Sequence, residues 1–290
     1  PKGSTHYPVA LFLCVFIFCR WAIKSLNQMQ QELFLEHTDY SKKKVLIGLS
    51  GGINSMAVLC WLASYPVEFK PKELHLFYAH FEEHSEGTLE FVLAGVEYAK
   101  SRFESVHYKQ TNNSVVSFFR EMNMIPHPTV APCTRLLKIM PMAEYAKDNG
   151  IDIDLVGYVR EEKRRIKNML AKNPNTKNTK GFPIADKENE WCFQIVKKEI
   201  GFYPSIYDLK DNQGNRIFAH NNCLPCKNWN KKNFAAGNEY FPEKMKPAIE
   251  LAKDLKKHWG REELDIYTRF DKEEWQTNDE GQTCEHCAFD

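Results

Sequence analysis

Two adjacent glycines near the start of the chain mark the stretch whose residue types point most directly to chemistry. Ser50, Gly51 and Gly52 follow the apolar run 45–49, which is long enough for a buried strand and too short for a helix. A helical spacing of apolar residues begins at Ser55. A strand, a glycine-rich turn and a helix N-terminus direct backbone N–H groups towards an anion, and serine hydroxyls add donors. We therefore expect a phosphate site here, with an ordinary strand-to-helix turn as the alternative.

A second group of reactive side chains consists of cysteines in the C-terminal half. Cys223 and Cys226 form one Cys-x-x-Cys pair, and Cys284 and Cys287 form another. Each such turn allows two thiolates to bind one metal ion, and two turns complete a four-sulfur shell. The gap between the pairs is longer than in small zinc modules, so the fold must bring them together. Free structural thiols and a thioredoxin-like redox pair are the alternatives. His75, His80, His84 and His107 show no His-x-x-x-His spacing, so we expect no histidine metal site.

Length and composition are those of an ordinary globular protein. The 290 residues suit one large or two small domains, and 43% hydrophobic and 27% charged residues are typical values. A net charge of +1 gives no global electrostatic case for binding nucleic acid. Nine cysteines in a chain of this size favour metal ligation in a reducing compartment over a secreted disulfide scaffold. We therefore expect a cytoplasmic protein.

The N-terminal segment 1–27 differs from the rest of the chain. Residues 9–18 form an unbroken apolar run, which is short for a membrane span of about 20 residues. The run has the length of a signal-peptide core, yet no small-x-small cleavage site follows it. We expect a packed N-terminal helix or sequence outside the native fold, and no membrane anchor.

Strand and helix patterns alternate through 28–210, which predicts one nucleotide-binding domain with a parallel, doubly wound sheet. Strands are expected at 45–49, 73–80, 105–109 and 153–159, and helices at 55–65, 87–102, 115–124, 134–149 and 161–170. Pro141 predicts a kink or break in its helix. Inward-facing residues of 87–102 should be Leu89, Val92, Leu93, Val96 and Ala99. Residues 172–180 are expected to be a loop or flap, and 211–290 a cysteine-rich, metal-bound region.

The stretch 50–55, SGGINS, resembles the PP-loop ATP pyrophosphatase superfamily, whose signature SGGxDS opens the first helix. The resemblance implies an adenine nucleotide alpha hydrolase-like fold whose loop holds a pyrophosphate or sulfate-like group. Asn54 stands where that family usually has Asp. Asn keeps hydrogen-bonding capacity and loses the charge, which weakens a role in holding Mg²⁺.

A longer stretch, 182–209, is similar to the P-x-x-D, Trp, helix, Gly, YPxxYxLG pattern of phosphoadenosine phosphosulfate (PAPS) reductases. The matching residues are Pro183, Asp186, Trp191, Gly201, Tyr203, Pro204 and Tyr207. Residues 157–162 resemble that family's GxRxxE turn, with Val159 in place of its Arg. Residues 80–82 stand where Asp-Thr-Gly is usual. These departures leave the family's ordinary nucleotide substrate and its full catalysis open.

The segment 133–142 is similar to the CCxxRKVxPL of assimilatory adenylyl-sulfate reductases, in which a CC pair and a later CxPC bind a 4Fe–4S cluster. This resemblance implies cluster ligands at Cys133, Cys223 and Cys226. Thr134 replaces the remaining cysteine of that pattern, so Cys284 or Cys287 could supply the missing ligand. We expect a cluster on Cys133, Cys223, Cys226 and Cys284. Cys287 would then be free to act as a sulfur-accepting nucleophile. The alternative is zinc on the two Cys-x-x-Cys pairs, which leaves Cys133 free.

The leading function hypothesis is a PAPS-reductase-like enzyme that binds ATP or an adenylyl-sulfate nucleotide. It would act in sulfonucleotide reduction or in ATP-dependent adenylation and sulfur transfer, with a sulfur donor protein or a nucleic-acid acceptor as partner, and it could form an oligomer. The candidate catalytic residues are Cys287 and Lys138. The candidate nucleotide-binding residues are Ser50, Gly51, Gly52, Asn54, Ser55, Arg160, Arg164 and Arg165. The basic stretch 160–180 is either a solvated surface or a phosphate-facing lid. The alternative function is a catalytically weakened, metal-stapled nucleotide sensor or interaction protein.

Overall fold

The computed structural model describes residues 38–124, 132–172 and 179–259. The chain divides into two compact units, Pro1–Asp39 and Tyr40–Asp290, and every helix and strand below belongs to the second. The N-terminal segment 1–27 and the cysteines Cys284 and Cys287 lie outside the described residues. Within the ranges given above, no helix combines the length and the apolar character needed to cross a membrane.

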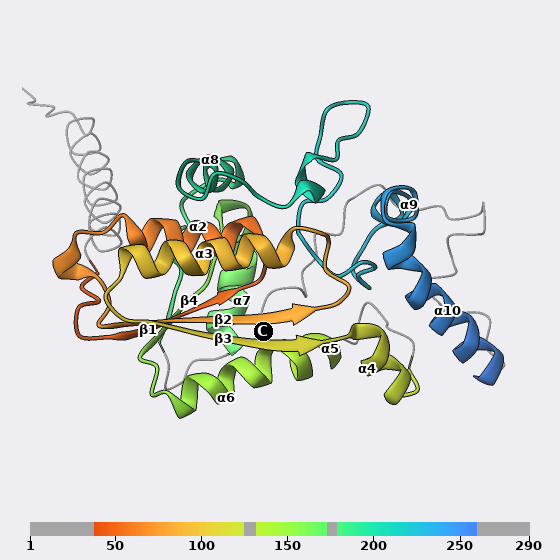
Figure 1. The fold of residues 1–290 in the computed structure, drawn as a ribbon, viewed down its shortest axis with the longest axis horizontal. Helices are drawn as coiled ribbons and strands as arrows, with labels where there is room; N and C mark the ends of the chain where they lie inside the picture. The colour runs from red at the N-terminus through yellow and green to blue at the C-terminus, as the bar shows by residue number, and fades with distance from the viewer. Residues whose placement is uncertain (1–37, 125–131, 173–178, 260–290) are drawn as a thin grey trace, which may run out of the picture. The chain divides into compact units, whose positions relative to one another are not determined.

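A five-stranded sheet, parallel throughout, forms the centre of this unit in the order β3-β2-β1-β4-β5 (Figure 1). The strands are β1 (Lys44–Leu49), β2 (Glu73–Phe81), β3 (Val106–Asn113), β4 (Ile153–Leu155) and β5 (Thr179–Gly181). The chain runs outward from β1 through β2 to β3 and then returns to β4 on the other side of β1. The order therefore reverses between β1 and β4, which is where open α/β sheets bind their ligands. The predicted doubly wound parallel fold is confirmed.

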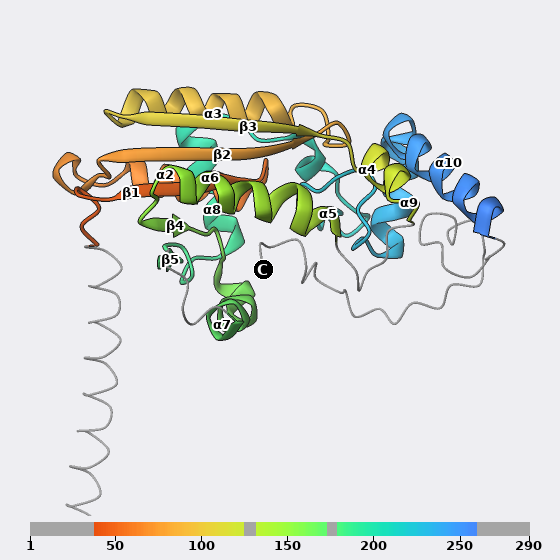
Figure 2. The same ribbon diagram turned by 90° about the horizontal axis from the view of Figure 1, so that it is seen from below.

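Helices cover both faces of the sheet. Successive residues of a strand point to opposite faces, so neighbouring residues of β1 belong to two different hydrophobic cores. Val45 and Ile47 belong to a core that includes α2 (Ile53–Ala63), α3 (Thr88–Arg102) and α8 (Asn189–Glu199). Leu46 belongs to the opposite core, with residues of α4 (Val115–Glu121), α6 (Met140–Asp148), α9 (Lys231–Tyr240) and α10 (Pro242–Trp259). Figure 1 and Figure 2 show α3 and α6 on opposite sides of the strands. The short elements are η1 (Val67–Phe69), α5 (Pro132–Thr134), η3 (Arg160–Glu162), α7 (Lys163–Lys172) and η4 (Ser205–Asp208).

The helix expected at 134–149 is interrupted, as Pro141 predicts. Residues Arg135–Ile139 form a π-helical segment, η2, and α6 begins immediately after it with Pro141 in its first turn. Proline has no backbone N–H to continue the α-helical ladder, so the chain uses the wider turn there. The π-helical segment contains Lys138, which the next subsection places in the candidate site.

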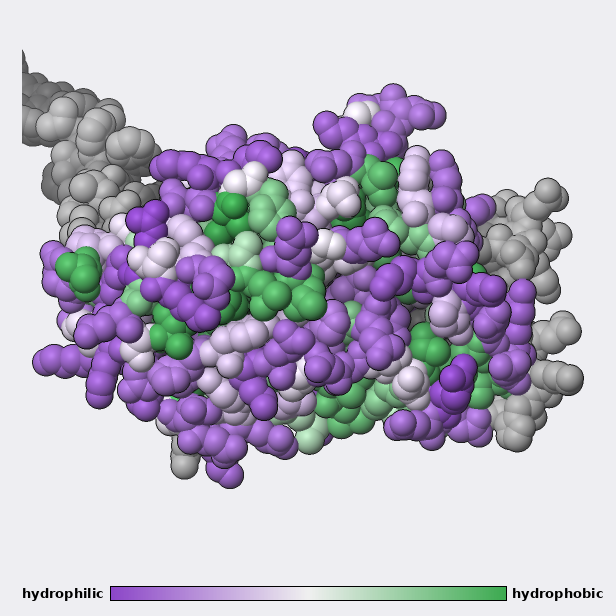
Figure 3. Space-filling model, in the orientation of Figure 1, coloured by the Kyte–Doolittle hydropathy of each residue, from purple (hydrophilic) through white to green (hydrophobic). Residues whose placement is uncertain are grey.

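Three sequence expectations differ from the structure. Leu93, expected to face inward, is 42% exposed on α3. Figure 3 shows hydrophobic side chains gathered over this helix on a face that is otherwise mostly hydrophilic. The strand expected at 153–159 ends at Leu155, and β5 pairs with it inside the stretch expected to be a loop. The strand β5 has three residues, which is too few to give a periodic signal in the sequence. It forms by hydrogen bonding to β4.

Candidate functional site

A pocket of about 110 Å³ lies at the carboxyl ends of β1 and β4. It includes Gly48 of β1 and residues 154–158, which follow or end β4. The predicted site residues in its lining are Ser50, Gly52, Asn54, Ser55, Lys138 and Arg165. The sheet topology alone would place a ligand at this point. The glycine-rich turn and the reversal of strand order therefore coincide.

Two serines organise the glycine-rich turn. The hydroxyl of Ser55 accepts the backbone N–H of Ser50 at 3.1 Å, and its oxygen lies 3.1 Å from Ser50 Oγ. Ser50 Oγ in turn accepts the N–H of Gly52 at 3.2 Å. Gly51 has φ +75°, and a Cβ there would come within 2.5 Å of Thr88 Cγ2. The turn therefore needs glycine at this position, and both hydroxyls face the backbone donors of the loop.

Two residues of the segment 207–221, which is distant in sequence, form hydrogen bonds with the backbone of the loop. The Tyr207 hydroxyl accepts the N–H of Ile53 at 3.2 Å and the N–H of Asn221 at 3.1 Å. Burial raises the pKa of Tyr207 to about 12, so its hydroxyl keeps its proton at neutral pH. Asn221 Nδ2 donates to the carbonyl of Gly51 and to Thr88 Oγ1, both at 2.9 Å. These bonds fix the loop against α3 and the C-terminal half of the unit.

The wall opposite the loop is formed by the segment after β4. A Cβ on Gly157 would come within 2.8 Å of the Asn54 carbonyl carbon and oxygen, so only glycine allows this close approach. Asn54 Nδ2 lies 3.5 Å from Glu162 Oε2, and Asn54 Oδ1 is buried with no hydrogen-bond partner among the described residues. The Glu162 carboxylate also pairs with Arg165, whose guanidinium stacks over the ring of Tyr158. Glu162 and Asn54 together present oxygen atoms to the pocket.

A second pocket, of about 30 Å³, brings three of the predicted metal ligands together. Cys133, Cys223 and Cys226 line it, and it shares Lys138 and Asn222 with the first pocket. Burial raises the pKa of the Cys223 and Cys226 thiols, and the Lys138 ammonium acts in the opposite direction on both. Cys133 also raises the pKa of both thiols, and Cys226 raises that of Cys223, as expected for neighbouring sulfurs.

The donor set of this second pocket fits a thiolate-bound metal centre. Its three sulfurs come from two segments far apart in the sequence, and the Leu224–Pro225 peptide bond between two of them is cis. A tetrahedral zinc with Zn–S bonds of about 2.3 Å requires sulfurs roughly 3.8 Å apart. In the part of the chain that the structure describes, these three sulfurs do not all lie within 4.8 Å of one another. Thiolate ligands suit both zinc and iron–sulfur centres.

The other predicted site residues lie elsewhere. Gly51 belongs to the loop without lining the pocket. Arg160 is exposed, donates to the Asp186 carbonyl and pairs with Glu188. Arg164 is exposed on α7 and is not among the residues lining the pocket. Of the three predicted arginines, the structure thus brings Arg165 to the loop pocket, and not Arg160 or Arg164. Cys284 and Cys287 lie outside the described residues, and their roles stay predictions.

Several pocket residues were not among the candidates from the sequence. They are Gly157, Glu162, Tyr207, His220, Asn221 and Asn222. Gly157, Glu162 and Tyr207 fall on the motif stretches of the family resemblance, which is the signal that could have identified them. Asn221 and Asn222 directly precede Cys223, yet nothing in their spacing indicates that they contact the loop.

Neither a family model nor a curated protein matches this sequence. Several solved structures have a similar fold. One is the U34-tRNA thiolase NcsA from Methanococcus maripaludis with its [4Fe-4S] cluster, at 13% identity and a TM-score of 0.44, covering 80% of this chain and 78% of that one. A PAPS reductase from Candida auris in a phosphate complex has 14% identity and a TM-score of 0.41, covering 71% and 94%. A 4-thiouridine synthetase–RNA complex with bound ATP has 15% identity and a TM-score of 0.39, covering 72% and 53%. The solved structures with a similar fold thus include a PAPS reductase.

Proposed function

We propose that the chain is an enzyme that binds an adenine nucleotide at the loop 50–55 and activates it for sulfur chemistry at the adjacent cysteines. The observation that carries this proposal is that the loop pocket and the three-cysteine pocket share Lys138 and Asn222. A phosphate bound at the loop would therefore lie next to nucleophilic or metal-bound sulfur. The nucleotide is ATP or an adenylyl-sulfate.

The loop would hold the phosphates through its backbone donors. The N–H groups of Ser50, Gly52 and Ile53 are bonded to three hydroxyl groups, at 3.1 to 3.2 Å. An anionic phosphate oxygen is a stronger acceptor than a hydroxyl, so at the N-terminus of α2 it would accept from the N–H groups of Ser50 and Gly52. The Ser50 and Ser55 hydroxyls would then donate to the phosphate as well. The same donors would then stabilise the charge that develops on a pyrophosphate or sulfite leaving group.

Lys138 is the cation best placed to act on both pockets. Its ammonium lies 4.9 Å from the centre of the Phe81 ring. This cation–π contact holds the Lys138 side chain between the loop pocket and the cysteine pocket. Burial raises the pKa of the Cys223 and Cys226 thiols, and the Lys138 charge offsets part of that rise. The same charge would attract a phosphate group in the loop pocket. We assign Lys138 the role of stabilising negative charge during the reaction.

Cys133, Cys223 and Cys226 would hold a 4Fe–4S cluster, with Cys284 as the proposed fourth ligand and zinc as the alternative. Such a cluster supplies electron-transfer or sulfur-binding chemistry when it is present. Cys287 is the proposed sulfur-accepting nucleophile. Oxygen atoms of Asn54 and Glu162 are candidates for a Mg²⁺ that accompanies the phosphates.

The experiment that tests this function compares products and variants in anaerobically purified full-length protein. The protein is incubated with ATP, adenylyl-sulfate or PAPS, and AMP, pyrophosphate and sulfite are measured. Pyrophosphate from ATP would indicate adenylation and sulfur transfer, whereas sulfite from a sulfonucleotide would indicate reduction. Ser55→Ala should weaken nucleotide binding about tenfold, or roughly 1.4 kcal/mol.

A matched serine at the other end of the same helix provides the control. Ser64 is exposed, and its hydroxyl donates only to the Trp61 carbonyl at 2.6 Å. Ser64→Ala should therefore bind nucleotide as the wild type does. Equal binding by wild type and Ser55→Ala, or no nucleotide binding at all, would remove the proposal.

A nucleotide sensor that has lost turnover is the second candidate, and Asn54 favours it. The side-chain amide of Asn54 offers a metal ion no negative charge, whereas a carboxylate would. The carboxylate of Glu162, which lines the same pocket, lies 3.5 Å from that amide. In this case ATP binds without release of pyrophosphate or AMP. The product assay above distinguishes the two functions directly.

A further inference from the structure

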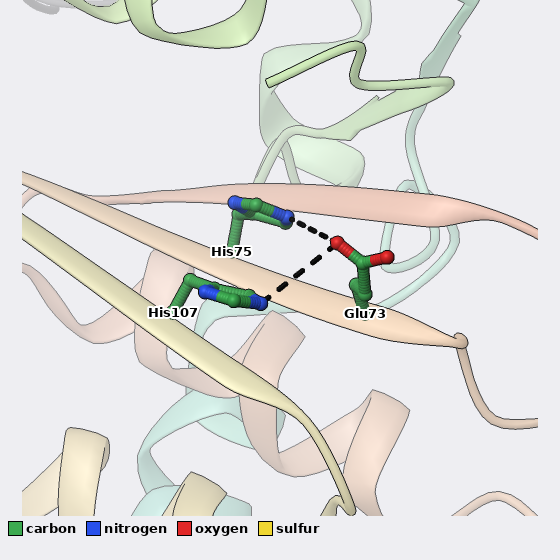
Figure 4. A group of neighbouring side chains, drawn as sticks. All are labelled: Glu73, His75 and His107. Atoms are coloured by element: carbon green, nitrogen blue, oxygen red, sulfur yellow. Dashed lines mark ion pairs between the residues drawn. The ribbon is translucent and has the colours of Figure 1, made fainter.

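Three potential metal ligands meet at the amino ends of β2 and β3. Glu73 and His75 are two residues apart on β2 and so point to the same face, and His107 is the register partner of His75 on β3. Figure 4 shows the two imidazole rings and the carboxylate turned towards one another. The phosphate loop follows the carboxyl end of β1, so this group lies at the opposite edge of the sheet. Sequence spacing does not reveal the group, because strand register creates it.

The spacing of the donor atoms is close to that of a tetrahedral zinc site. Glu73 Oε2 lies 3.4 Å from His75 Nε2 and 3.8 Å from His107 Nε2. One ligand atom from each residue falls within 4.8 Å of the other two. Bonds of about 2.0 to 2.1 Å in a tetrahedron place neighbouring ligand atoms roughly 3.4 Å apart. Small side-chain movements are therefore enough to form the site.

His75 is a buried ligand whose Nε2 faces the Glu73 carboxylate. Its side chain is 2% exposed, and among the described residues its Nε2 makes no hydrogen bond and lies 3.4 Å from Glu73 Oε2. The other ring nitrogen, Nδ1, lies 2.9 Å from the Tyr145 hydroxyl, which can fix the ring orientation and tautomer as outer partners of metal-bound histidines do. Burial and the neighbouring His107 lower the pKa of His75, which keeps the ring neutral and able to bind a metal.

The two rings also hold each other in place while leaving an access route. The His75 and His107 ring centres are 4.5 Å apart, with the planes 18° from parallel. The His107 side chain is 49% exposed, so an ion can reach the group from solvent. Its Nε2 lies 3.2 Å from Ser105 Oγ, a contact that a metal would replace.

A lysine competes for the carboxylate. Lys44, the register partner of Glu73 on β1, places its Nζ 2.9 Å from Glu73 Oε2. This ammonium and a divalent cation repel each other across the shared carboxylate, so the lysine weakens metal binding. The lysine side chain is 35% exposed and can swing towards solvent when an ion arrives.

We propose that Glu73, His75 and His107 form a zinc-binding site that links β2 to β3, with one coordination position left for water. Two imidazoles and one carboxylate are a ligand set that zinc accepts with an open fourth position. The site is separate from the cysteine pocket and from the proposed nucleotide chemistry.

The test locates zinc directly in crystals of the full-length protein and counts it in solution. In zinc-soaked crystals, an anomalous difference peak should lie about 2.0 to 2.2 Å from one atom of each ligand. After equilibrium dialysis against zinc, wild-type protein should retain one more ion per chain than His107→Gln, whose half-exposed side chain can change without disturbing the core. Glu104→Gln removes a nearby exposed carboxylate outside the group and should retain the wild-type zinc content.

Lys44→Met supplies a variant with the opposite expected effect. Removing the competing ammonium should tighten zinc binding at this site by about tenfold, whereas any zinc on the cysteines should bind unchanged. Equal zinc content in wild type and His107→Gln would overturn the proposal. An anomalous peak on the cysteines and none at Glu73, His75 and His107 would also overturn the proposal.

Discussion

Asn221 donates a hydrogen bond of 2.9 Å from its side-chain amide to the backbone carbonyl of Gly51, 170 residues earlier in the chain. The same amide donates to Thr88, and Asn221 Oδ1 accepts from Ser85 at 2.9 Å. One buried side chain thus joins the glycine-rich loop 50–55, the start of α3 and the segment that leads into Cys223. The loop and the cysteine pocket are therefore parts of one hydrogen-bonded structure.

Asn221→Asp should loosen this connection without changing the size of the side chain. A carboxylate cannot donate to Gly51 or Thr88, and it places a buried negative charge beside the loop. We expect a loss of about 2 to 3 kcal/mol in the free energy of unfolding, measured in urea, and at least tenfold weaker nucleotide binding. Asn112→Asp, on the exposed side of β3, is the matched control and should change neither quantity. Wild-type nucleotide affinity in Asn221→Asp would contradict the proposed role.

Gly157→Ala should destabilise the site through a backbone clash. The new Cβ would lie 2.8 Å from the carbonyl group of Asn54, and a backbone in a helix N-terminus cannot move aside easily. We expect a loss of about 1 to 3 kcal/mol in the free energy of unfolding, together with weaker nucleotide binding.

Gly95→Ala offers a comparison in which the contact is flexible. A Cβ at Gly95 would meet the end of the Met56 side chain, and alanine also favours the helix by about 1 kcal/mol. Its unfolding free energy should change less than that of Gly157→Ala. A larger loss of unfolding free energy in Gly95→Ala than in Gly157→Ala would show that the backbone around Gly157 moves to accommodate the new Cβ.

Asn54→Asp should make the loop pocket responsive to Mg²⁺. The new carboxylate would lie beside Glu162, so the two charges repel each other in the absence of a cation. We expect lower thermal stability without Mg²⁺ and a larger rise in Tm on adding Mg²⁺ than in the wild type. The double variant Asn54→Asp with Glu162→Gln removes the repulsion and should lose this difference. An equal response to Mg²⁺ in Asn54→Asp and wild type would rule out a cation site at these residues.

Local sequence signals predicted the parts of the structure that depend on neighbours in the chain. The run of strand, glycine turn and helix around Gly51 and the break at Pro141 were both visible because each depends on residues only a few positions apart. The contacts of Asn221 with the loop, and of His75 with His107, were not visible, because tertiary packing and strand register create them. The strand β5 was missed because it has three residues and forms by pairing with β4. The helix α10 was also missed, although the buried residues Met245, Ala248, Ala252 and Leu255 follow a helical spacing that could have indicated it.

Cys133→Ser and Cys192→Ser should separate metal-binding thiols from buried structural ones. Cys133 lines the pocket with Cys223 and Cys226, whereas burial in the core raises the pKa of Cys192 to about 12. With a 4Fe–4S cluster, anaerobically purified wild type should be brown and bleach with dithionite. Cys133→Ser should lose the colour and Cys192→Ser should keep it. A colourless protein in which Cys133→Ser retains one zinc would assign zinc to the two Cys-x-x-Cys pairs.

The last prediction concerns His84, whose buried ring should make the protein less stable in mild acid. Its side chain is 4% exposed, and its Nδ1 lies 2.8 Å from the Tyr78 hydroxyl. Burial, and then the charges of Lys138, His80 and Lys244, hold the pKa of His84 well below its usual value. In the unfolded chain a histidine titrates near pH 6.5, so below that pH the unfolded state binds one more proton.

The free energy of unfolding should therefore fall as the pH drops below about 6.5, by up to roughly 1.4 kcal/mol per pH unit for this one group. His84→Asn keeps an acceptor for Tyr78 and removes the titration, so its stability should fall less steeply between pH 6.5 and 5. Urea unfolding at several pH values measures the two slopes. In the wild type, the NMR signal of the His84 ring should also show no titration while the protein stays folded. Identical slopes in wild type and variant would show that His84 is charged in the folded protein, which the desolvation of its ring strongly opposes.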